Sequence, residues 1–225
     1  MGAVKGVKAK RMPRAVREQQ MMDAAVHIFG RRGYRAASMD EIAELAGVSK
    51  PLVYLYLNSK EELFTACIRR EAARLTEAVK AAIEPGLAAD RQLWAGLEAF
   101  FRHTAENPDA WSVLHRQART HGEPFAAEVT AMREELTAFV TFLIGAAARE
   151  GTPPAPGTAG AGRSGELADR DIEGLAQALV GAAESLAGWA NESDKLAAKD
   201  AAATLMNFAW TGLGGLMRGE RWSPR

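Results

Sequence analysis

The sequence predicts an all-α protein, and three observations support this fold class. Apolar residues recur at three- and four-residue spacing through most of the 225 residues, which is typical of amphipathic helices. Capping residues and Gly or Pro divide the chain at intervals that suit globular helices. No segment shows the period-two alternation with turn signals that indicates a sheet. We therefore expect a small N-terminal three-helix domain, joined by a long helix to a larger helical domain.

The expected boundaries follow changes in composition. Residues 1–13 contain Gly and Lys without periodicity and are predicted to be a basic disordered arm, followed by the small domain at 14–60. Residues 61–225 form the larger domain. Within it, residues 151–165 consist mostly of Gly, Pro, Ala and Thr, so we expect a flexible loop there.

Charge is distributed unevenly between the two domains. Residues 1–60 hold 11 Lys and Arg against 5 Asp and Glu, and since the whole chain has a formal charge of zero, the remainder carries −6. A basic first domain on an acidic body favours nucleic-acid contact through one end of the molecule.

The sequence also limits the compartment. The single cysteine, Cys67, excludes an intrachain disulfide and is expected to be a buried thiol on an apolar helix face. No apolar stretch is long enough to cross a membrane, and the basic N-terminus lacks the hydrophobic segment of a secretion signal. We therefore expect a cytoplasmic protein without membrane contact.

The first helix is expected from Arg14 to Arg32, with Gly33 ending it. His27 lies beside its apolar stripe, and because no second His follows at i+4, we interpret it as structural rather than as a metal ligand. The stripe itself consists of Met22, Ala25, Val26 and Phe29.

Residues 38–60 have the pattern of two short helices joined by a tight turn. Ser38 can cap a helix whose first turn is acidic, and Gly47 can adopt the left-handed conformation that ends it. Ser49 caps again, and Pro51 sits in a first turn, where its missing N–H does no harm. Such a unit places its second helix in the major groove of DNA.

The apolar run from Leu52 to Leu57 leaves an alternative open, because taken alone it also fits a buried β-strand. The caps at Ser49 and Ser59 and the lack of a partner-strand signal favour a helix. In that helix the expected inward residues are Val53, Tyr56 and Leu57, and the expected outward residues are Lys50, Leu52, Tyr54 and Leu55.

These residues resemble the N-terminal DNA-binding domain of TetR-type transcriptional regulators. The matching motifs are Ser38, Ile42-Ala43, Ala46-Gly47-Val48-Ser49, Tyr54-Leu55-Tyr56-Leu57 and Ser59-Lys60-Glu61. The chain departs from the family pattern at Pro51, where Gly is frequent, and at Leu57, where Phe is usual. The resemblance covers about the first quarter of the chain.

The resemblance implies a ligand-responsive regulator, expected to be a repressor that a small apolar or aromatic molecule releases from a palindromic operator. By this correspondence Tyr54, Tyr56 and Lys60 would hold the DNA backbone. Lys50 and Leu52 would face base edges, since Lys can bond guanine and Leu can touch a thymine methyl group. The full set of residues expected at double-stranded DNA is Ser38, Ser49, Lys50, Pro51, Leu52, Tyr54, Leu55, Tyr56 and Lys60.

A long helix is expected to join the two domains. Ser59 can cap it, with Glu62 at the third position completing a capping box. Its apolar face continues as far as Ile83, before Pro85 and Gly86 end it.

The larger domain continues as a series of amphipathic segments. Asp90 is expected to cap one of them, and Pro108 and Pro124 each open another. Aromatic and apolar residues in these middle helices suit a pocket for a small molecule. The expected pocket residues are Trp94, Phe101, Trp111, His115, Phe125, Met132 and Phe139. Each of them also fits a role in the core, so we expect only some of them to line a cavity.

Two last helices are expected to pair with the same helices of a second copy. The result would be a four-helix interface about a two-fold axis and a homodimer with two DNA-reading helices. The alternative is that these helices close their own core. The expected interface residues are Leu175, Leu179, Leu186, Leu205, Phe208, Gly212 and Leu216.

Two other function classes stay open. An architectural DNA-binding protein would have the same first domain but no ligand cavity. An enzyme has little support, because the sequence has no HExxH pattern, phosphate loop or nucleophile elbow. We therefore expect no metal, no cofactor and no catalytic residues, although His115 with Asp109 or Glu128 is the one conceivable dyad.

Overall fold

The structure, a computed structural model, describes residues 13–56, 58–150, 168–192 and 196–217. Within these ranges it is helical and contains no strand, which confirms the all-α class. The helices are α1 (Arg14–Ala36), α2 (Met39–Leu45), α3 (Lys50–Tyr56), α4 (Lys60–Ala81), α5 (Ala89–Glu106), α6 (Pro108–Ser112), the π-helix η1 (Val113–Gln117), α7 (Ala118–Thr120), α8 (Phe125–Glu150), α9 (Asp169–Asn191) and α10 (Ala198–Met217). The basic arm before Pro13, the loop at 151–165 and Leu57 lie outside the described residues.

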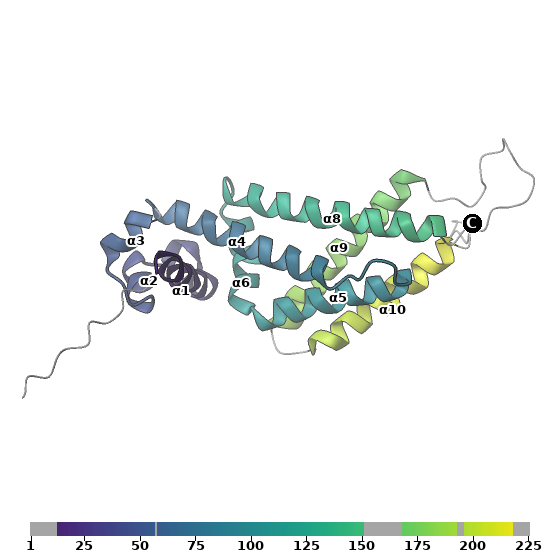
Figure 1. The fold of residues 1–225 in the computed structure, drawn as a ribbon, viewed down its shortest axis with the longest axis horizontal. Coiled ribbons are helices and arrows are strands. Elements are labelled where there is room, and N and C mark those ends of the chain that lie inside the picture. The colour runs from purple at the N-terminus through teal and green to yellow at the C-terminus, as the bar shows by residue number, and fades with distance from the viewer. Residues whose placement is uncertain (1–12, 57, 151–167, 193–195, 218–225) are drawn as a thin grey trace, which may run out of the picture.

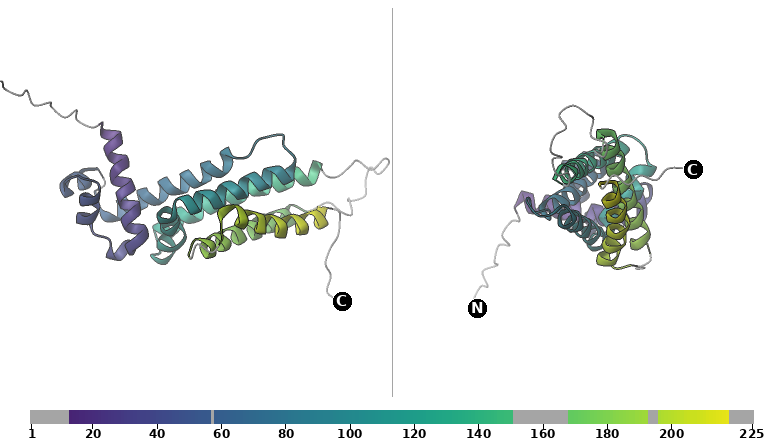
Figure 2. Two further views of the ribbon diagram at one scale, coloured as in Figure 1. Left: turned by 90° about the horizontal axis from the view of Figure 1, so that it is seen from below. Right: turned by 90° about the vertical axis from the view of Figure 1, so that its right-hand side faces the viewer.

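The molecule is elongated, with α1, α2 and α3 at one end (Figure 1). Helix α4 leads from this end into the body, which is formed by α5, α8, α9 and α10. Figure 2 shows α1 crossing the long axis, whereas α5, α8 and α10 run along it. The observed arrangement is the expected three-helix domain joined by a long helix to a helical body.

Helix α1 departs from helical geometry at Gly33, the residue expected to end it. Gly33 has φ 80° and ψ 160°, a conformation that favours glycine, and one further turn continues to Ala36. The side chains of Met21, Ala25 and Phe29 are fully buried. The sequence stripe therefore identified the face of α1 that packs on the rest of the protein.

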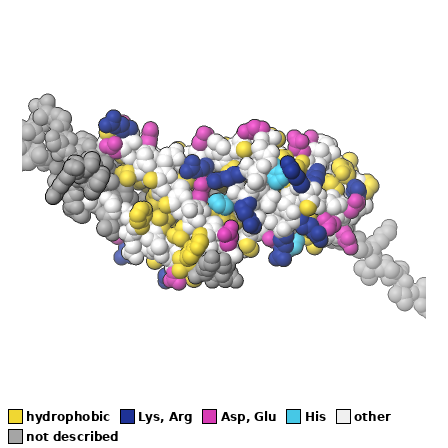
Figure 3. All heavy atoms as spheres, turned by 180° about the vertical axis from the view of Figure 1, so that it is seen from behind, with side chains coloured by type: hydrophobic (Ala, Val, Ile, Leu, Met, Phe, Trp, Pro, Cys, Tyr) yellow, Lys and Arg dark blue, Asp and Glu magenta, His cyan; other side chains and the backbone are white. Residues whose placement is uncertain are grey.

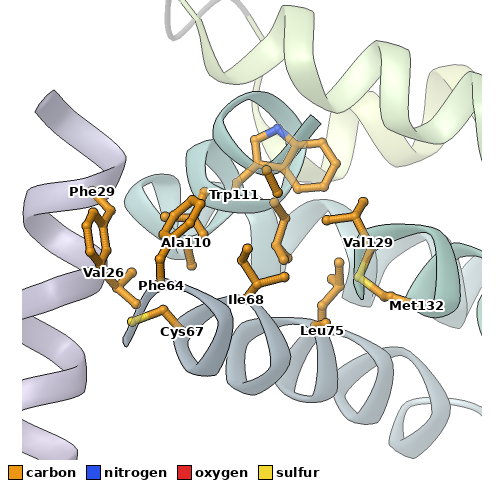
Figure 4. Packing of buried hydrophobic residues seen from close by; sticks show 14 of the residues in the cluster. Val26, Phe29, Phe64, Cys67, Ile68, Leu75, Ala110, Trp111, Val129 and Met132 are labelled. Carbon is orange, nitrogen blue, oxygen red and sulfur yellow. The ribbon is translucent and has the colours of Figure 1, made fainter. Parts of the chain in front are cut away.

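Helix α4 belongs to both parts of the molecule. Figure 4 shows Phe64 and Cys67 on the side of Val26 and Phe29 of α1, whereas Leu75 lies toward α8. One continuous apolar cluster runs from Met21 in α1 to Leu205 in α10. The three-helix end is therefore packed onto the body through a shared core.

Two helix starts differ from the expectation in detail. The Ser59 hydroxyl accepts a hydrogen bond from the Glu62 N–H at 3.0 Å, but the Glu62 carboxylate accepts from Asn58 Nδ2 at 2.9 Å and does not close a capping box. Helix α5 begins at Ala89, so Asp90 lies in its first turn rather than at its cap. A carboxylate in the first turn also interacts favourably with the helix dipole. An acidic residue near a helix start therefore does not by itself identify the cap, and the expected cap lay two residues after the observed one, Ala88.

Pro108 is at the start of α6, and α8 begins directly after Pro124, as expected. Helix α8 packs on α9, and α5 packs on α10, and side chains from all four helices line one cavity. Among the described helices, none has both the length and the hydropathy needed to span a membrane.

Candidate DNA-binding surface and ligand cavity

The helix-turn-helix unit is built by local hydrogen bonds. The Ser38 hydroxyl accepts from the Asp40 N–H at 3.1 Å, and the Ser38 N–H donates to Glu41 Oε2 at 3.3 Å, which closes a capping box at α2. Gly47 has φ 65° and makes the turn, and the N–H of the next residue, Val48, returns to α2. The sequence predicted this unit correctly.

Helix α3 presents most of its residues outward. Val53 is fully buried, whereas Tyr54 is 39% exposed and Leu55 is 75% exposed. Leu52 is half-buried, and Pro51 is exposed. The strand alternative for this run is wrong, and α3 is a helix with an exposed outer face.

The ends of α3 are held by neighbours. Ser49, which is exposed, precedes the helix, and its carbonyl oxygen accepts the N–H of Leu52 at 2.9 Å. Lys50 Nζ lies 2.9 Å from Asp40 Oδ2, and both side chains are exposed. Tyr56 is half-buried and faces the core, with the Arg14 guanidinium 4.9 Å from its ring centroid.

Lys60, at the start of α4, is anchored to the region that links α1 and α2. Its Nζ donates to the Arg35 carbonyl at 3.2 Å and lies 4.9 Å from the centroid of the Tyr34 ring. Partial burial lowers the pKa of the Lys60 ammonium below its ordinary value. Lys60 therefore also supports the packing of the domain.

A large apolar cavity lies in the body. Its empty volume, including the part open to solvent, is about 1100 Å³, and its walls come from α4, α5, α6, α8, α9 and α10. Apart from the two indole nitrogens, the polar side chains in its lining are those of Gln92 and Glu184. Such a lining suits a ligand that is mostly hydrocarbon.

Three of the seven expected pocket residues line this cavity: Trp111, Met132 and Phe139. The other four do not, and the expectation for them is corrected. The ring of Phe125 packs on Phe64 in an aromatic cluster near α1, with the centroids 4.8 Å apart. Phe101 is buried, and its ring centroid lies 5.3 Å from that of Phe100.

Trp94 and His115 lie next to the cavity without lining it. Trp94 is half-buried against the core. The His115 ring is stacked behind Trp111, with the centroids 4.8 Å apart. The helical period placed all seven residues on middle helices, but it could not show which side of each helix faces the empty space.

The conceivable dyad is not assembled. Asp109 Oδ2 lies 2.8 Å from His27 Nδ1, and Glu128 is paired with Arg69, so neither carboxylate is the partner of His115. Burial lowers the pKa of His115. Within the described residues, no group of three or more His, Cys, Asp and Glu side chains is placed to hold a metal ion.

The cavity wall is directly connected to α1. Trp111 lines the cavity, and the hydroxyl of its neighbour Ser112 donates to the Gly30 carbonyl of α1 at 2.8 Å. A Cβ atom at Gly30 would lie 2.6 Å from the carbonyl oxygen of Asp109, so α1 and α6 are in backbone contact. His27 Nδ1 lies within hydrogen-bond distance of Asp109 Oδ2, at 2.8 Å, and so adds a further contact between α1 and α6.

The expected interface residues fall into two groups. Leu179 and Leu205 are buried within the chain itself, and Leu179 lines the cavity, so both are corrected to core positions. Phe208 is 75% exposed, and Gly212 is exposed on the same helix. Leu175 and Leu186 are half-buried, and the side chain of Leu216 lies outside the described part.

Sequence reasoning missed the polar side chain at the inner wall of the cavity. Glu184 is 9% exposed and lies within the apolar stripe of α9, next to Ala183. A carboxylate inside an apolar stripe was the available signal, because such a group is normally buried only with a partner.

The comparisons with known proteins agree with this architecture. Residues 21–67 match the model of bacterial regulatory proteins of the tetR family, and residues 89–212 match that of the tetracyclin repressor-like C-terminal domain. The chain is 30% identical over 207 residues to the HTH-type transcriptional activator FasR of Mycolicibacterium smegmatis, covering 92% of this chain and 87% of FasR.

Two solved structures show the same fold. A TetR-like transcriptional regulator from Rhodococcus sp. RHA1 has 39% identity and a TM-score of 0.74, with 91% of this chain and all of that chain covered. FadR from Bacillus subtilis, solved in complex with stearoyl-CoA, has 19% identity and a TM-score of 0.68, with 90% and 98% covered. The chain belongs to the TetR family and is a DNA-binding transcriptional regulator.

Proposed function

We propose that this regulator binds a palindromic operator as a homodimer and is released from it when a long hydrocarbon ligand occupies the cavity. The observation that carries the proposal is the apolar cavity whose wall residue Trp111 adjoins Ser112, which is bonded to Gly30 of α1. A ligand that displaces Trp111 would therefore shift the neighbouring residue Ser112, which is hydrogen-bonded to α1 of the three-helix end.

The ligand class we favour is a long acyl chain rather than a compact aromatic molecule. Most of the lining residues on α5, α8 and α9 are aliphatic, and Trp111 and Trp210 also line the cavity. A protein with the same fold, FadR of Bacillus subtilis, was solved with stearoyl-CoA, and a FadR from Bacillus halodurans is described as a fatty acid degradation regulator. Both points support a lipid-derived effector.

The contacts to DNA are proposed to be divided between backbone and bases. Tyr54 and Tyr56 would bond phosphate oxygens, while Lys50 and Leu52 would meet base edges. Asp40 lies 2.9 Å from Lys50 and would orient it toward the groove. Lys60 would bind phosphate only while keeping its anchoring contact with Arg35.

The homodimer is proposed to form through the exposed faces of α9 and α10. Large hydrophobic side chains reach the surface of the body, which Figure 3 shows from one side, and Phe208 and Trp189 are 75% and 48% exposed. Gly174 and Gly212 leave open space on the same helices, which allows close helix approach. Exposed apolar area of this kind marks a protein interface. Leu175 and Leu186 would contribute from its edge.

The proposal states that the ligand lowers the affinity for DNA. Whether transcription then rises or falls depends on the position of the operator. The relatives include an activator, FasR, and a repressor, AcnR of Corynebacterium diphtheriae. A regulator that leaves DNA derepresses a gene when its operator overlaps the promoter. We propose repression as the default outcome.

The test begins by selecting bound sequences from a random DNA pool, where we expect a palindrome whose half-sites are about one helical turn or a multiple of it apart. Fluorescence anisotropy of the selected operator then follows release by palmitoyl-CoA at fixed salt concentration.

Val140→Trp, which fills the cavity from α8, should abolish release while leaving operator binding intact. Phe142→Trp, on the same helix but 63% exposed and outside the cavity lining, should behave like the original chain. Unchanged release by Val140→Trp would contradict the proposal.

A further inference from the structure

One end of the apolar cavity carries a cluster of charged groups. Glu184 lines the cavity, and its Oε2 lies 2.9 Å from Arg119 Nη2 and 3.4 Å from Arg133 Nε. A carboxylate this deeply buried is stable only because two guanidinium groups compensate its charge. The cluster holds two positive charges against one negative charge, so it has capacity for a further acceptor or anion.

Two buried nitrogen atoms beside this cluster, Trp111 Nε1 and His115 Nδ1, have no hydrogen-bond partner in the protein. Their rings are stacked, with the centroids 4.8 Å apart. Figure 4 shows the indole nitrogen of Trp111 on the side of the ring that faces away from Ile68 and Leu75 of α4. Since buried polar groups are satisfied in the great majority of cases, two such atoms on stacked rings indicate a position for a polar ligand atom.

A second pocket lies on the other side of Glu184. It is lined by polar residues that include His115, Arg119 and Glu192, and its empty volume including open space is about 600 Å³. Glu184 lines both this pocket and the apolar cavity. Gly188 makes room there, because a Cβ atom on it would lie 2.9 Å from His115 Nε2.

We propose that the cavity and this polar pocket form one amphipathic site. The hydrocarbon chain of the ligand lies in the cavity, and its acyl oxygen lies at the guanidinium of Arg119, which shares the Glu184 carboxylate with Arg133. The inference rests on the proposed function, and it adds the recognition of the ligand's head. The head is either the carboxylate of a free fatty acid or the carbonyl of an acyl thioester, since both present an oxygen acceptor on a long chain.

The inference predicts a difference in affinity between ligands that carry an acyl oxygen and ligands of the same chain length that lack it. An acyl oxygen accepts from the partly exposed guanidinium of Arg119, and a charged donor strengthens the bond. Glu184 competes for the same two arginines. Removing the negative charge of Glu184 should therefore strengthen the binding of an anionic head, whereas removing an arginine should weaken it.

The experiment measures calorimetric affinities of the full chain for three probes with the same chain length: laurate, lauroyl-CoA and dodecan-1-ol. We expect laurate or lauroyl-CoA to bind about tenfold tighter than the alcohol. Arg133→Met should reduce this preference to about threefold or less, and Glu184→Gln should increase the affinity for laurate about tenfold. Arg119→Met, at a side chain that is 42% exposed, gives the same test if Arg133→Met does not fold.

The control is Arg69→Met, because Arg69 pairs with Glu128 on the surface and lies outside both pockets. It should keep the preference of the original chain. A preference for laurate alone or for lauroyl-CoA alone supports the inference and identifies the source of the acyl group.

Equal affinities for all three probes, or a preference that persists in every cluster variant, would overturn the inference and leave the cluster as a purely structural ion triad. The chain-binding cavity would survive that result. If none of the probes binds at all, the proposed function fails, and this inference fails with it.

Discussion

The DNA-binding end and the ligand cavity differ in how far apart along the chain their residues lie. The proposed DNA-binding surface lies within residues 38–60, and neighbours in sequence hold it through the bonds at Ser38 and the turn at Gly47. The cavity draws on residues from Leu75 to Trp210, carried by six helices. The shape of the first depends mostly on local hydrogen bonds, whereas a cavity assembled from six helices changes whenever one of them shifts.

The largest expected effect comes from the backbone contact between α1, at the three-helix end, and α6, which carries the cavity residue Trp111. Gly30→Ala places a Cβ atom 2.6 Å from the Asp109 carbonyl oxygen, so α1 must move away from α6. We expect a loss of about 3 kcal/mol in the free energy of unfolding, measured in urea. Gly145→Ala on α8 is the matched control, since its Cβ atom would meet only the movable guanidinium of Arg149, with Nη1 at 3.2 Å. Equal stabilities of the two variants would contradict a tight contact.

The second prediction uses Cys67, which is covered by α1 and has its pKa raised to about 12 by burial. Because the thiolate is the reactive form, iodoacetamide at pH 8 should label the native protein about a hundredfold more slowly than the urea-unfolded protein. In a Cys67→Ala background, Thr130→Cys on α8 provides an exposed control that should react rapidly in the native state. Rapid native labelling of Cys67 would mean that α1 opens readily from α4.

A third prediction separates the two kinds of DNA contact. Tyr54→Ala should weaken binding about tenfold for every operator variant, because it removes a phosphate contact. Lys50→Ala should instead change the preference at one base pair by about 1–3 kcal/mol. Leu87→Ala, at an exposed position between α4 and α5, should change neither. Uniform losses for both Tyr54→Ala and Lys50→Ala across an operator library would refute this division.

The smallest expected effect tests whether the DNA-binding unit depends on its local caps. Ser38→Ala removes the hydroxyl that accepts from Asp40 and should reduce stability by about 1 kcal/mol in thermal unfolding. Thr130→Ala, an exposed position on α8, is the control and should stay within about 0.5 kcal/mol of the original chain. A neutral result at Ser38 would mean that packing, not capping, holds α2.

The accuracy of the sequence predictions follows the same division between local and distant contacts. Ser38, Gly47 and Val53 were predicted correctly because capping, turn geometry and helical period are properties of neighbouring residues. Leu179 was expected at an interface but lies in the core, because an apolar stripe shows which face of a helix is buried without showing what covers it.

The cavity was predictable only in outline. Trp111 and Met132 line it, but Phe125, which belongs to the same kind of aromatic set, packs toward Phe64. Choosing among them requires the packing of α8 against α4 and α9, which no local pattern contains. Glu184 could have been found as a charge within an apolar stripe, although its two arginine partners come from elsewhere in the chain.

The single buried anchor of α3 has a consequence for how such regulators diversify. Of the seven residues of this helix, all of them described, Val53 alone is buried. In the proposed role of α3, substitutions at its exposed positions, Lys50, Pro51, Tyr54 and Leu55, therefore alter what the helix reads at little risk to folding. Operator preference is thus separable from the scaffold that carries the helix.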